Sequence, residues 1–430
     1  MHAVDGLSRL LRVAFPLVVR GGPSLATGPR RRRARRNRDT LRSLRRVGLG
    51  IALAVAAVAA TVPASAAAGE KPAFIRSAEI LVPSDLENRD CRTGVCQHNE
   101  NTDLTRWKGD IYLAHRTAGS QVLGPNSSLR VYRSENDGES FELRAIVPAP
   151  PDRDIRDPHF YKVGKRLHIK AITRLPGFAL RDTGAGSISI ETHSRDGKTW
   201  SGLNEIGPIE WGFWRVVEHD GTYYSAAYQD GDLQVVLYRS RNGKRWKEGA
   251  QIYGVSEDTP LETELIPTPS GKRMLGLVRM DGTDEELFGS QGRLRTKVCW
   301  ARKPFDEFRC PQELDGVRLD GPVAFRWKGR LFVIARKHIP GPDIRKRTAL
   351  YEITGNLERG PIDIVEHGEL PSAGDTSYAG VARIGGPRFL ATWYSSPPAE
   401  DPSWIEGFGG RTDIWQATLD LSLLPKPPRS

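Results

Sequence analysis

Helical periodicity is nearly absent from the sequence beyond residue 70. Without apolar residues spaced three and four positions apart over long stretches, helical bundles and folds that alternate strands with helices are excluded. The nine histidines show no paired spacing, and no Asp-rich loop matches a calcium-binding pattern. We therefore expect an all-β fold without a metal site or a cofactor.

An excess of charge is absent from most of the chain. The formal net charge is +11, but residues 1–66 contain 13 Arg and two Asp, which accounts for all of it. The remaining residues are neutral overall, and no basic stripe with interleaved aromatic residues occurs among them. We therefore expect no nucleic-acid partner.

The N-terminal segment has the composition of an export signal. Arg30–Arg46 is dense in arginine, Val47–Val62 is uncharged, and Ala64-Ser65-Ala66 matches a cleavage site. The uncharged run is 16 residues long, which is short for a membrane span, so a retained anchor is the less favoured alternative. We expect residues 1–66 to be a Sec or twin-arginine signal. The mature protein would then be secreted, with no stable membrane association after signal cleavage.

Cysteine is scarce, with 4 residues in 430, and these fall into two close pairs. The pairs are Cys91/Cys96 and Cys299/Cys310. In an exported protein, an even number of locally paired cysteines predicts disulfides. A zinc site is disfavoured because no histidines at finger spacing accompany the cysteines.

Six segments repeat one pattern, a short apolar strand that follows a turn. They are 108–116, 164–174, 220–228, 271–279, 328–336 and 386–394. Each lies between another strand-like run and a β-rich run, and each unit has room for a fourth strand. This repetition predicts a six-bladed β-propeller with four-stranded blades over residues 91–430, preceded by a linker and first strand over 67–90. A β-sandwich is the alternative, but it does not require six copies of one unit.

A seven-residue phrase marks one turn of the repeat. It reads SRDGKTW at 194–200 and SRNGKRW at 240–246, with a looser copy at 134–141. The Asp or Asn followed by Gly predicts a tight turn between the third and fourth strands, and the aromatic residue packs back against the blade. We interpret these Asp residues as structural.

Blade geometry brings two rings of side chains to the face opposite these turns. The first strand lines the channel and the second runs antiparallel to it, so the start of one and the end of the other share a face. The first-strand ring includes Asn99, Glu100, Asp157, Trp214, Glu262, Asp320, Asp375 and Tyr378, and the second strands end in Arg116, Arg174, Tyr228, Arg279, Arg336 and Tyr394. Four arginines facing several carboxylates predict a carbohydrate or glycoconjugate substrate that is acidic or polyhydroxylated. Trp214 is a candidate for a wall on which a sugar stacks.

Three segments together resemble the sialidase (neuraminidase) superfamily of glycoside hydrolases. GPNSSLRVYRSENDGESF (124–141) is similar to the segment leading into the first Asp-box, or BNR repeat, of secreted bacterial sialidases. ETELIPTPSGKRMLGLVR (262–279) is similar to the fourth-blade segment, and DTSYAGVARIGGPRFLATWY (375–394) to the sixth. The resemblance covers essentially the whole mature chain and implies a six-bladed sialidase-like propeller.

The resemblance assigns roles to individual residues. Tyr378 would be the nucleophile and Glu262 its base, with Glu264 as a competitor on the same strand face. A carboxylate that takes the phenolic proton during attack avoids holding a free phenolate, which would cost about 5 kcal/mol near pH 6. Arg279 would bind the substrate. A further substrate-binding arginine is expected from the fifth blade, where Arg336 is favoured by the ring geometry and Arg347 by the resemblance, with Arg345 also competing.

Two positions depart from the family pattern. Asn99 stands about where the first family arginine is expected, and Gln121 is the nearest match to the acid/base aspartate. Glutamine cannot donate a proton as a general acid, so the acid would come from Asp157, Glu100 or Asp375. Two other functions stay open. Arg156-Asp157-Pro158 matches a triplet of five-bladed furanosidase propellers, and the chain could also be a non-catalytic carbohydrate-binding propeller.

Overall fold

The computed structural model describes residues 71–121, 124, 126–175, 186–229, 234–254, 259–281, 294–341 and 343–425. The chain divides into two compact units, Met1–Glu70 and Lys71–Ser430, and every described residue belongs to the second. The export signal expected over 1–66 therefore lies outside the described residues. Among the residues that are described, no helix is long and apolar enough to cross a membrane.

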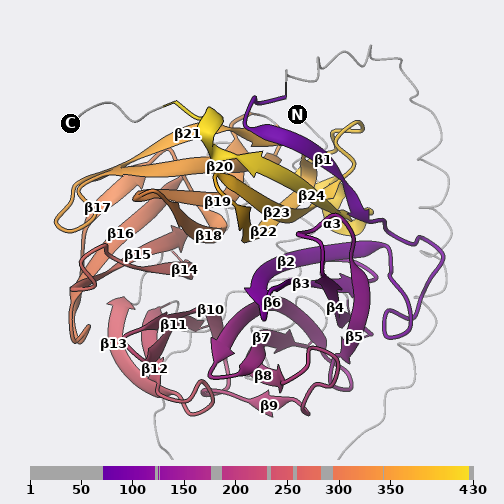
Figure 1. Ribbon diagram of the computed structural model, residues 1–430, viewed down its shortest axis with the longest axis horizontal. Helices are drawn as coiled ribbons and strands as arrows, with labels where there is room; N and C mark the ends of the chain where they lie inside the picture. The colour runs from indigo at the N-terminus through magenta and orange to yellow at the C-terminus, as the bar shows by residue number, and fades with distance from the viewer. Residues whose placement is uncertain are drawn as a thin grey trace, which may run out of the picture. The chain divides into compact units, whose positions relative to one another are not determined.

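The second unit is an all-β structure, as the sequence predicts. Two short helical segments, α3 (Trp404–Gly409) and the 3-10 turn η2 (Leu421–Leu423), accompany the strands in the described ranges. Strands that follow one another in sequence pair as antiparallel hairpins (Figure 1). The short turns between them carry Gly at positive φ, as at Gly109, Gly164 and Gly221.

Four-stranded sheets are confirmed. Three of them take consecutive strands: β2 (His98–Trp107), β3 (Asp110–Ala118), β4 (Ser128–Ser134) and β5 (Glu142–Pro148); β14 (Pro260–Pro267), β15 (Arg273–Met280), β16 (Arg295–Arg302) and β17 (Phe308–Asp315); β18 (Asp320–Trp327), β19 (Arg330–Ile339), β20 (Arg345–Gly355) and β21 (Ile362–Leu370). The repeated segments of the sequence are the second strands of the sheets, and the β-rich runs that follow them are the third strands.

Two further sets of four are joined by one parallel bridge between Trp211 and Ile188. They are β6 (Asp154–Val163), β7 (Arg166–Arg174), β8 (Ile188–Ser194) and β9 (Asn204–Glu205), and β10 (Trp211–His219), β11 (Thr222–Gln229), β12 (Val235–Ser240) and β13 (Lys247–Tyr253). The last sheet combines both ends of the chain: β22 (Ala373–Gly385), β23 (Arg388–Ser396), β24 (Asp413–Asp420) and β1 (Ile75–Val82). The first strand, expected within 67–90, thus completes the sheet of the last strands.

The first strands of the sheets contact one another around a common centre (Figure 1). β2 contacts β6 and β22, β10 contacts β6 and β14, and β18 contacts β14 and β22. Each starts opposite the end of its second strand, as in the pairs Asp154–Arg174, Pro260–Met280 and Asp320–Arg336. This register brings the two predicted rings of side chains to one end of the sheets.

The first strands share an irregularity near their starts. The pairing register shifts between Glu100 and Asp103 in β2, and at the corresponding places in β6, β10, β14, β18 and β22. Positive φ angles occur in these stretches at Asn101, Asp157, Gly321, Ser377 and Tyr378. Such bulges re-aim side chains, and here they occur in the part of each strand that carries the candidate site residues.

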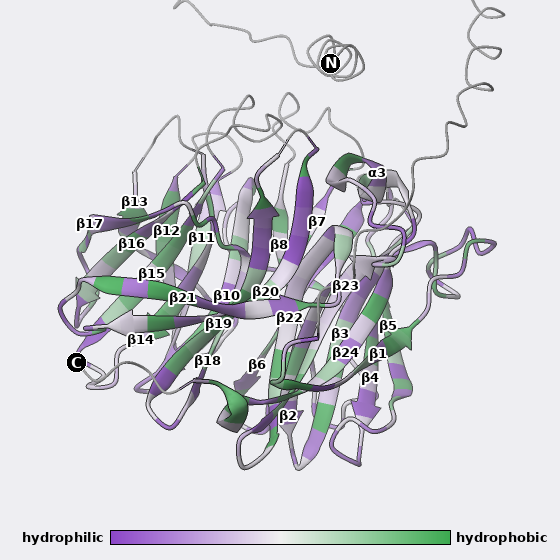
Figure 2. Cartoon of the chain, turned by 90° about the horizontal axis from the view of Figure 1, so that it is seen from above, coloured by the Kyte–Doolittle hydropathy of each residue, from purple (hydrophilic) through white to green (hydrophobic). Residues whose placement is uncertain are grey.

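Apolar clusters pack between neighbouring sheets. One contains Val131 of β4 and Ile169 of β7, another Leu237 of β12 and Val278 of β15. The strands accordingly carry apolar as well as polar stretches in Figure 2, with α3 at one end of the sheets. Burial of these contiguous apolar faces supplies most of the driving force for folding.

The repeated seven-residue phrase forms the predicted turn. Asp196 Oδ1 accepts hydrogen bonds from the backbone N–H groups of Lys198 and Thr199, both at 2.8 Å. Gly197 has a φ of 76°, and a Cβ there would lie 2.4 Å from the Tyr112 hydroxyl oxygen of the preceding sheet. The phrase therefore repeats because it closes a hairpin and lets that hairpin approach its neighbour closely.

Both predicted disulfides form. The sulfurs of Cys91 and Cys96, and those of Cys299 and Cys310, are bonded, and no free cysteine occurs in the described chain. The first bond closes a loop just before β2, and the second links β16 to β17.

Candidate active site

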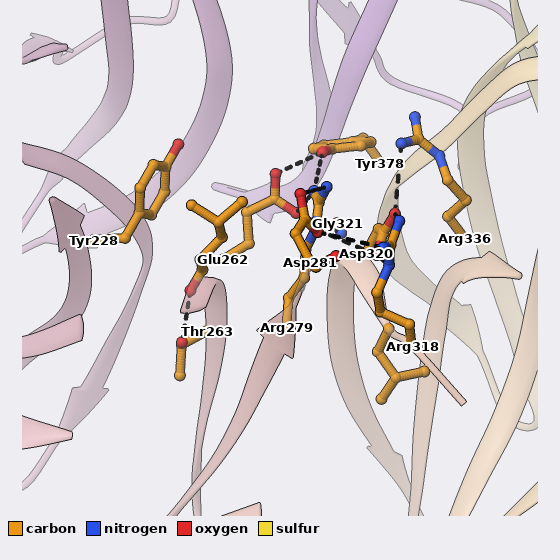
Figure 3. Close-up of polar contacts among 12 residues, drawn as sticks. Tyr228, Glu262, Thr263, Arg279, Asp281, Arg318, Asp320, Gly321, Arg336 and Tyr378 are labelled. Carbon is orange, nitrogen blue, oxygen red and sulfur yellow. Dashed lines mark hydrogen bonds and ion pairs between the residues drawn. The ribbon is translucent and has the colours of Figure 1, made fainter. Parts of the chain in front are cut away.

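Tyr378 stands on a distorted part of β22. The register shifts between Ser377 and Gly380, and the φ angles of Ser377 and Tyr378 are 103° and 50°. Non-glycine residues rarely adopt such angles, and they persist where the surroundings fix them. The hydroxyl of Tyr378 donates a hydrogen bond of 2.5 Å to Glu262 Oε1 (Figure 3). The two residues assigned as nucleophile and base are therefore in direct contact.

Glu262 reaches Tyr378 from β14 and is only 6% exposed. Its other oxygen, Oε2, accepts hydrogen bonds from Arg279 Nη1 at 2.7 Å and from the backbone N–H of Gly321 at 2.8 Å. These two donors fix the carboxylate so that Oε1 remains directed at the phenol.

Gly321 is required by this arrangement for two reasons. Its φ is 57°, which glycine adopts at little cost. A Cβ at this position would also lie 2.8 Å from Cγ and Cδ2 of Tyr378. A side chain here would therefore displace the tyrosine ring from Glu262.

Arg279 lies beside the pair and is bound by protein acceptors on every side. Nη1 donates to Glu262 and, at 2.9 Å, to the Tyr378 hydroxyl. The opposite edge pairs with Asp281, and Nε lies 3.2 Å from Asp320 Oδ1. Arg279 thus orients Tyr378 and Glu262, while its charge is matched by carboxylates.

Arg336 approaches Tyr378 from β19. Its guanidinium carbon lies 5.0 Å from the centre of the tyrosine ring, a cation–π distance. Nη2 donates to Asp375 Oδ1 at 3.0 Å and to the Tyr394 hydroxyl at 2.6 Å. The two predicted arginines Arg279 and Arg336 therefore both contact Tyr378, but each already has an acidic partner.

Electrostatics keep Tyr378 protonated at rest. Burial and the charge of Glu262 raise its pKa well above the usual value, although Arg279 and Arg336 act in the opposite direction. A free phenolate is therefore not the resting form, and nucleophilic attack needs a base in contact with the hydroxyl. Glu262 is the residue in that position.

Asp157 lies in a bulge on β6, where its φ is 54°. Its charge acts on Tyr378, and the charge of Glu262 acts on both residues. Burial raises the pKa of Asp157 to about 6, and the charge of Glu262 adds to the shift. Lys170, fully buried nearby, has its pKa lowered to about 7 by burial, against the opposing charge of Asp157. A carboxyl group that keeps its proton to nearly neutral pH is suited to general acid catalysis.

Glu264, the alternative candidate for the role of base, faces a cavity that Tyr378 does not line. It lines a cavity of about 360 Å³ together with Asp103 and Arg215, and Tyr378 is not among the lining residues. Its Oε1 accepts from the backbone N–H of Ala324 at 2.9 Å. Burial raises its pKa to about 7. The strand bulge separates the two glutamates, so only Glu262 touches the tyrosine.

Trp214 does not form an open wall. Its side chain is 0% exposed, and its ring meets Tyr378 edge-on with centroids 5.9 Å apart. A sugar cannot stack on a ring without exposed surface. Trp214 instead packs against the ring of Tyr378.

Arg116, Glu100 and Asn99 form a closed polar region between β2, β3 and β24 rather than an open binding surface. Arg116 is 0% exposed and bonds Glu100 Oε1 at 2.6 Å and Asp154 Oδ1 at 2.9 Å. Asn99 donates from Nδ2 to the carbonyl oxygens of Cys96 and Thr412 at 3.1 Å. These predicted substrate-binding side chains are buried, and their polar groups bond protein partners rather than facing an open surface.

His98 connects this region to the site. Its Nε2 lies 3.5 Å from both Glu100 and Asp375. Burial alone would lower the pKa of His98, but hydrogen bonds with Asp375 and Glu100 raise it to about 9. The protonated imidazole therefore bridges β2 and β22 and neutralises two buried carboxylates.

Arg347 lies apart from Tyr378, at a loop. Its Nη2 donates to Asp401 at 2.7 Å, and Arg345 pairs with the same carboxylate. In that loop, Ser403 and Glu406 form a capping box at α3, and Trp404 donates to Asp375 Oδ1 at 3.2 Å. Arg347, favoured by the resemblance, thus holds the loop, whereas Arg336, favoured by ring geometry, contacts Tyr378.

The backbone of Gln121 lies beside the same loop. Its N–H donates to Phe408 O at 3.2 Å and its carbonyl accepts from Arg156 Nη2 at 2.8 Å. Arg156 also pairs with Asp154. Both residues therefore have positions fixed by backbone and ion-pair contacts.

Sequence reasoning included Asp320 in the first-strand ring but missed Asp281, Arg318 and His338, which lie with it behind Arg279. Asp281 follows it by two residues on the same strand face, and Asp320 holds Arg318 at 2.9 Å and His338 at 2.8 Å (Figure 3). The spacing of Arg279 and Asp281, two residues apart, was the sequence signal that could have predicted their ion pair. The strand pattern gave no sign that Arg318 pairs with Asp320, because Arg318 lies in the connection between β17 and β18.

Two groups of described residues have the geometry to hold a metal ion: His98, Glu100 and Asp375, and His168, Glu191 and His193. In the first group the carboxylates are already bonded to Arg116 and Arg336, and the His98 proton takes the place of a cation. The second group lies on β7 and β8 beside Lys244, whose ammonium is 3.3 Å from His193 Nε2. A cation is disfavoured next to that ammonium.

Comparison with known proteins shows that this chain is similar to solved structures in its fold. No protein-family model matches the chain, and no curated protein sequence matches it. Among solved structures, the NanB sialidase from Streptococcus pneumoniae is 11% identical, with a TM-score of 0.59 over 80% of this chain and 71% of that one. Trypanosoma rangeli sialidase is 12% identical, with a TM-score of 0.54 over 76% of this chain and 56% of that one.

A third similar structure is a protein of unknown function from Dyadobacter fermentans, 16% identical with a TM-score of 0.54. That similarity covers 80% of this chain and 100% of the other. This chain therefore spans little more than half the length of the trypanosomal enzyme and matches the whole of the uncharacterised protein. At these identities the comparisons establish a sialidase-like fold.

Proposed function

We propose that this sialidase-like chain is a secreted glycoside hydrolase in which Tyr378 is the nucleophile, Glu262 its base and Asp157 the general acid. The observation that carries the proposal is the 2.5 Å hydrogen bond from the Tyr378 hydroxyl to Glu262 Oε1. Secretion is supported by the composition of residues 1–66 and by the two disulfides.

The proposal includes a six-bladed propeller. The first strands contact one another in the closed sequence β2, β6, β10, β14, β18 and β22, and each begins one set of four strands. A five-bladed furanosidase propeller would lack one such set. Arg156, the first residue of the triplet Arg156-Asp157-Pro158, also forms an ion pair with Asp154. This pairing further disfavours the furanosidase alternative.

The chemistry would proceed in two displacements at the anomeric carbon. The Tyr378 oxygen attacks that carbon while Glu262 takes the phenolic proton, and Asp157 protonates the departing glycosidic oxygen. Water then cleaves the tyrosyl–sugar bond, with Asp157 as the base that activates it and Glu262 returning the proton to the phenol. Two inversions give net retention of configuration, and tyrosine nucleophiles are an established exception to the two-carboxylate scheme.

Asp157 is the best placed of the three carboxylates considered as the acid. Glu100 is paired with Arg116, and Asp375 accepts from Arg336, Tyr394 and Trp404. Although burial acts to raise it, the bond with His98 and the charge of Arg336 lower the pKa of Asp375. Burial raises the pKa of Asp157 to about 6, in contrast to that of Asp375.

The charges around the site affect whether an acidic or a neutral sugar would bind. Three of the four arginines that suggested an acidic substrate have carboxylate partners: Arg116 with Glu100 and Asp154, Arg279 with Asp281, and Arg336 with Asp375. Recognition would then rest on hydrogen bonds as much as on net charge. Acidic and neutral sugars therefore both belong in the test.

The test is hydrolysis of a panel of aryl glycosides by the purified mature chain and by Tyr378→Phe. The panel contains an α-sialoside, uronides, neutral hexosides and an α-L-arabinofuranoside. We expect release of the aglycone from one class, at a rate that falls at least about a thousandfold in the variant. A 2-fluoro analogue of the hydrolysed sugar should leave a covalent adduct on Tyr378, detected by mass spectrometry of the digested protein.

Two outcomes would contradict the proposal. Activity that survives Tyr378→Phe would move the chemistry to carboxylates near Asp157. Binding of sugars without hydrolysis of any member would instead favour a non-catalytic carbohydrate-binding propeller.

Replacing Asp157 by asparagine should change the pH dependence of hydrolysis. The acid works in its protonated form, so kcat/KM of the wild type should fall as the pH rises above about 6, the pKa of Asp157. In Asp157→Asn this alkaline limb should disappear, and glycosides with poor leaving groups should lose about a hundredfold in rate or more. Nitrophenyl glycosides, whose leaving groups need little protonation, should lose less, and equal losses for both would exclude Asp157 as the acid.

A further inference from the structure

A second cavity lies at the turn end of the sheets, away from Tyr378. Its volume is about 480 Å³, and it is lined by Lys108, Val163, Lys165, Arg166, His168, Arg195, Asn242 and Lys244. These residues come from the β2–β3 and β6–β7 turns, from β7, and from the two copies of the seven-residue phrase. The cavity therefore lies where three neighbouring sheets meet.

The lining is strongly cationic and lacks acidic side chains. Five of the eight residues are Lys or Arg, and none is Asp or Glu. Within the described ranges, none of these five cations has a carboxylate within ion-pair distance. The phrase itself contributes, because Asn242 stands where the other copy has Asp196 and so adds no negative charge.

A buried imidazole completes the cavity. His168 is 1% exposed and lines the space. Its Nδ1 lies 2.6 Å from Glu191 Oε1, but neither ring nitrogen has a hydrogen-bond partner among the described residues. A buried ring nitrogen without a partner is unusual, and a bound ligand would satisfy it.

We propose that this cavity is a binding site for a sulfate or phosphate group, distinct from the glycosidase site and independent of its activity. A tetrahedral oxyanion offers several acceptors to the arginine forks and lysine ammonium groups around it. Five cations without acidic partners would repel a metal ion. The volume exceeds that of one oxyanion, so part of the molecule that bears the group also fits.

The test uses the full mature chain and isothermal titration with sodium sulfate and sodium phosphate at constant ionic strength. We expect saturable one-site binding, and a loss of affinity of about tenfold or more in Arg166→Gln/Lys244→Gln. The matched control is Arg245→Gln/Lys247→Gln, which removes two exposed charges from the same hairpin without touching the cavity lining. The control and Tyr378→Phe should both bind as the wild type does.

Further titrations identify the molecule that bears the group. A monosaccharide sulfate, a monosaccharide phosphate and the unsubstituted sugar are compared, and only the substituted sugars should bind. Equal affinity of wild type and Arg166→Gln/Lys244→Gln for sulfate and phosphate would overturn the proposal. So would tight binding of a DNA oligonucleotide without a response to either inorganic ion. A crystal soaked in sulfate should show density beside His168 Nε2, and density elsewhere only would also overturn it.

Discussion

Glu262→Gln is expected to lower kcat/KM for the hydrolysed glycoside by about a thousandfold without unfolding the protein. Glutamine keeps the size of the side chain and can still accept from Arg279 Nη1 and Gly321 N–H, but it cannot take the phenolic proton from Tyr378. Initial rates at several pH values, with thermal unfolding of both proteins, provide the measurement.

Glu264→Gln is the matched control for this change. Both glutamates are 6% exposed and lie two residues apart on β14, but Glu264 bonds Ala324 N–H and faces the cavity that it shares with Arg215. Its replacement should leave kcat/KM within about twofold of the wild type. If the two variants lose activity equally, the base has been assigned to the wrong glutamate.

Arg116→Met is expected to produce the largest loss of stability among the predicted site residues, about 3 kcal/mol in the free energy of unfolding. Arg116 is fully buried between Glu100 and Asp154, so its removal leaves two carboxylates in the interior without their main counter-ion. Urea denaturation at pH 7 measures the loss.

Arg347→Gln provides the comparison, because this arginine was also a candidate for substrate binding. It pairs with Asp401 and Glu369 at side chains that are partly open to solvent, so the loss should be under about 1 kcal/mol. Equal destabilisation by the two replacements would show that the charges of Glu100 and Asp154 are relieved by His98 and Arg156 instead.

The sequence predicts the strands and turns of this chain well because their signals are local. The six repeated segments are second strands, the Asp-Gly and Asn-Gly phrases close hairpins between third and fourth strands, and the cysteines pair with their nearest partners. Each feature depends on residues within about ten positions of one another, where periodicity and turn preference are informative.

The site is less visible in the sequence because its geometry depends on bulges and on burial. Alternation along β14 cannot separate Glu262 from Glu264, since the register shift between Pro260 and Thr263 is set by pairing with β15. Likewise, Arg116 and Arg336 occupy equivalent strand ends, but one is enclosed by Glu100 and Asp154 whereas the other lies over the Tyr378 ring. These differences arise from residues distant in sequence.

The pairing of β1 with β24 has a consequence for the order in which the chain folds. Arg76 and Asp420, which are bonded across this pair, are 344 residues apart. The strand β1, which is made first, must therefore stay unpaired until the last strand, β24, has been synthesised. Contacts of such high sequence separation slow folding. During that interval an exposed strand edge is open to association with other chains, so folding of this protein should benefit from a chaperone that covers the unpaired edge.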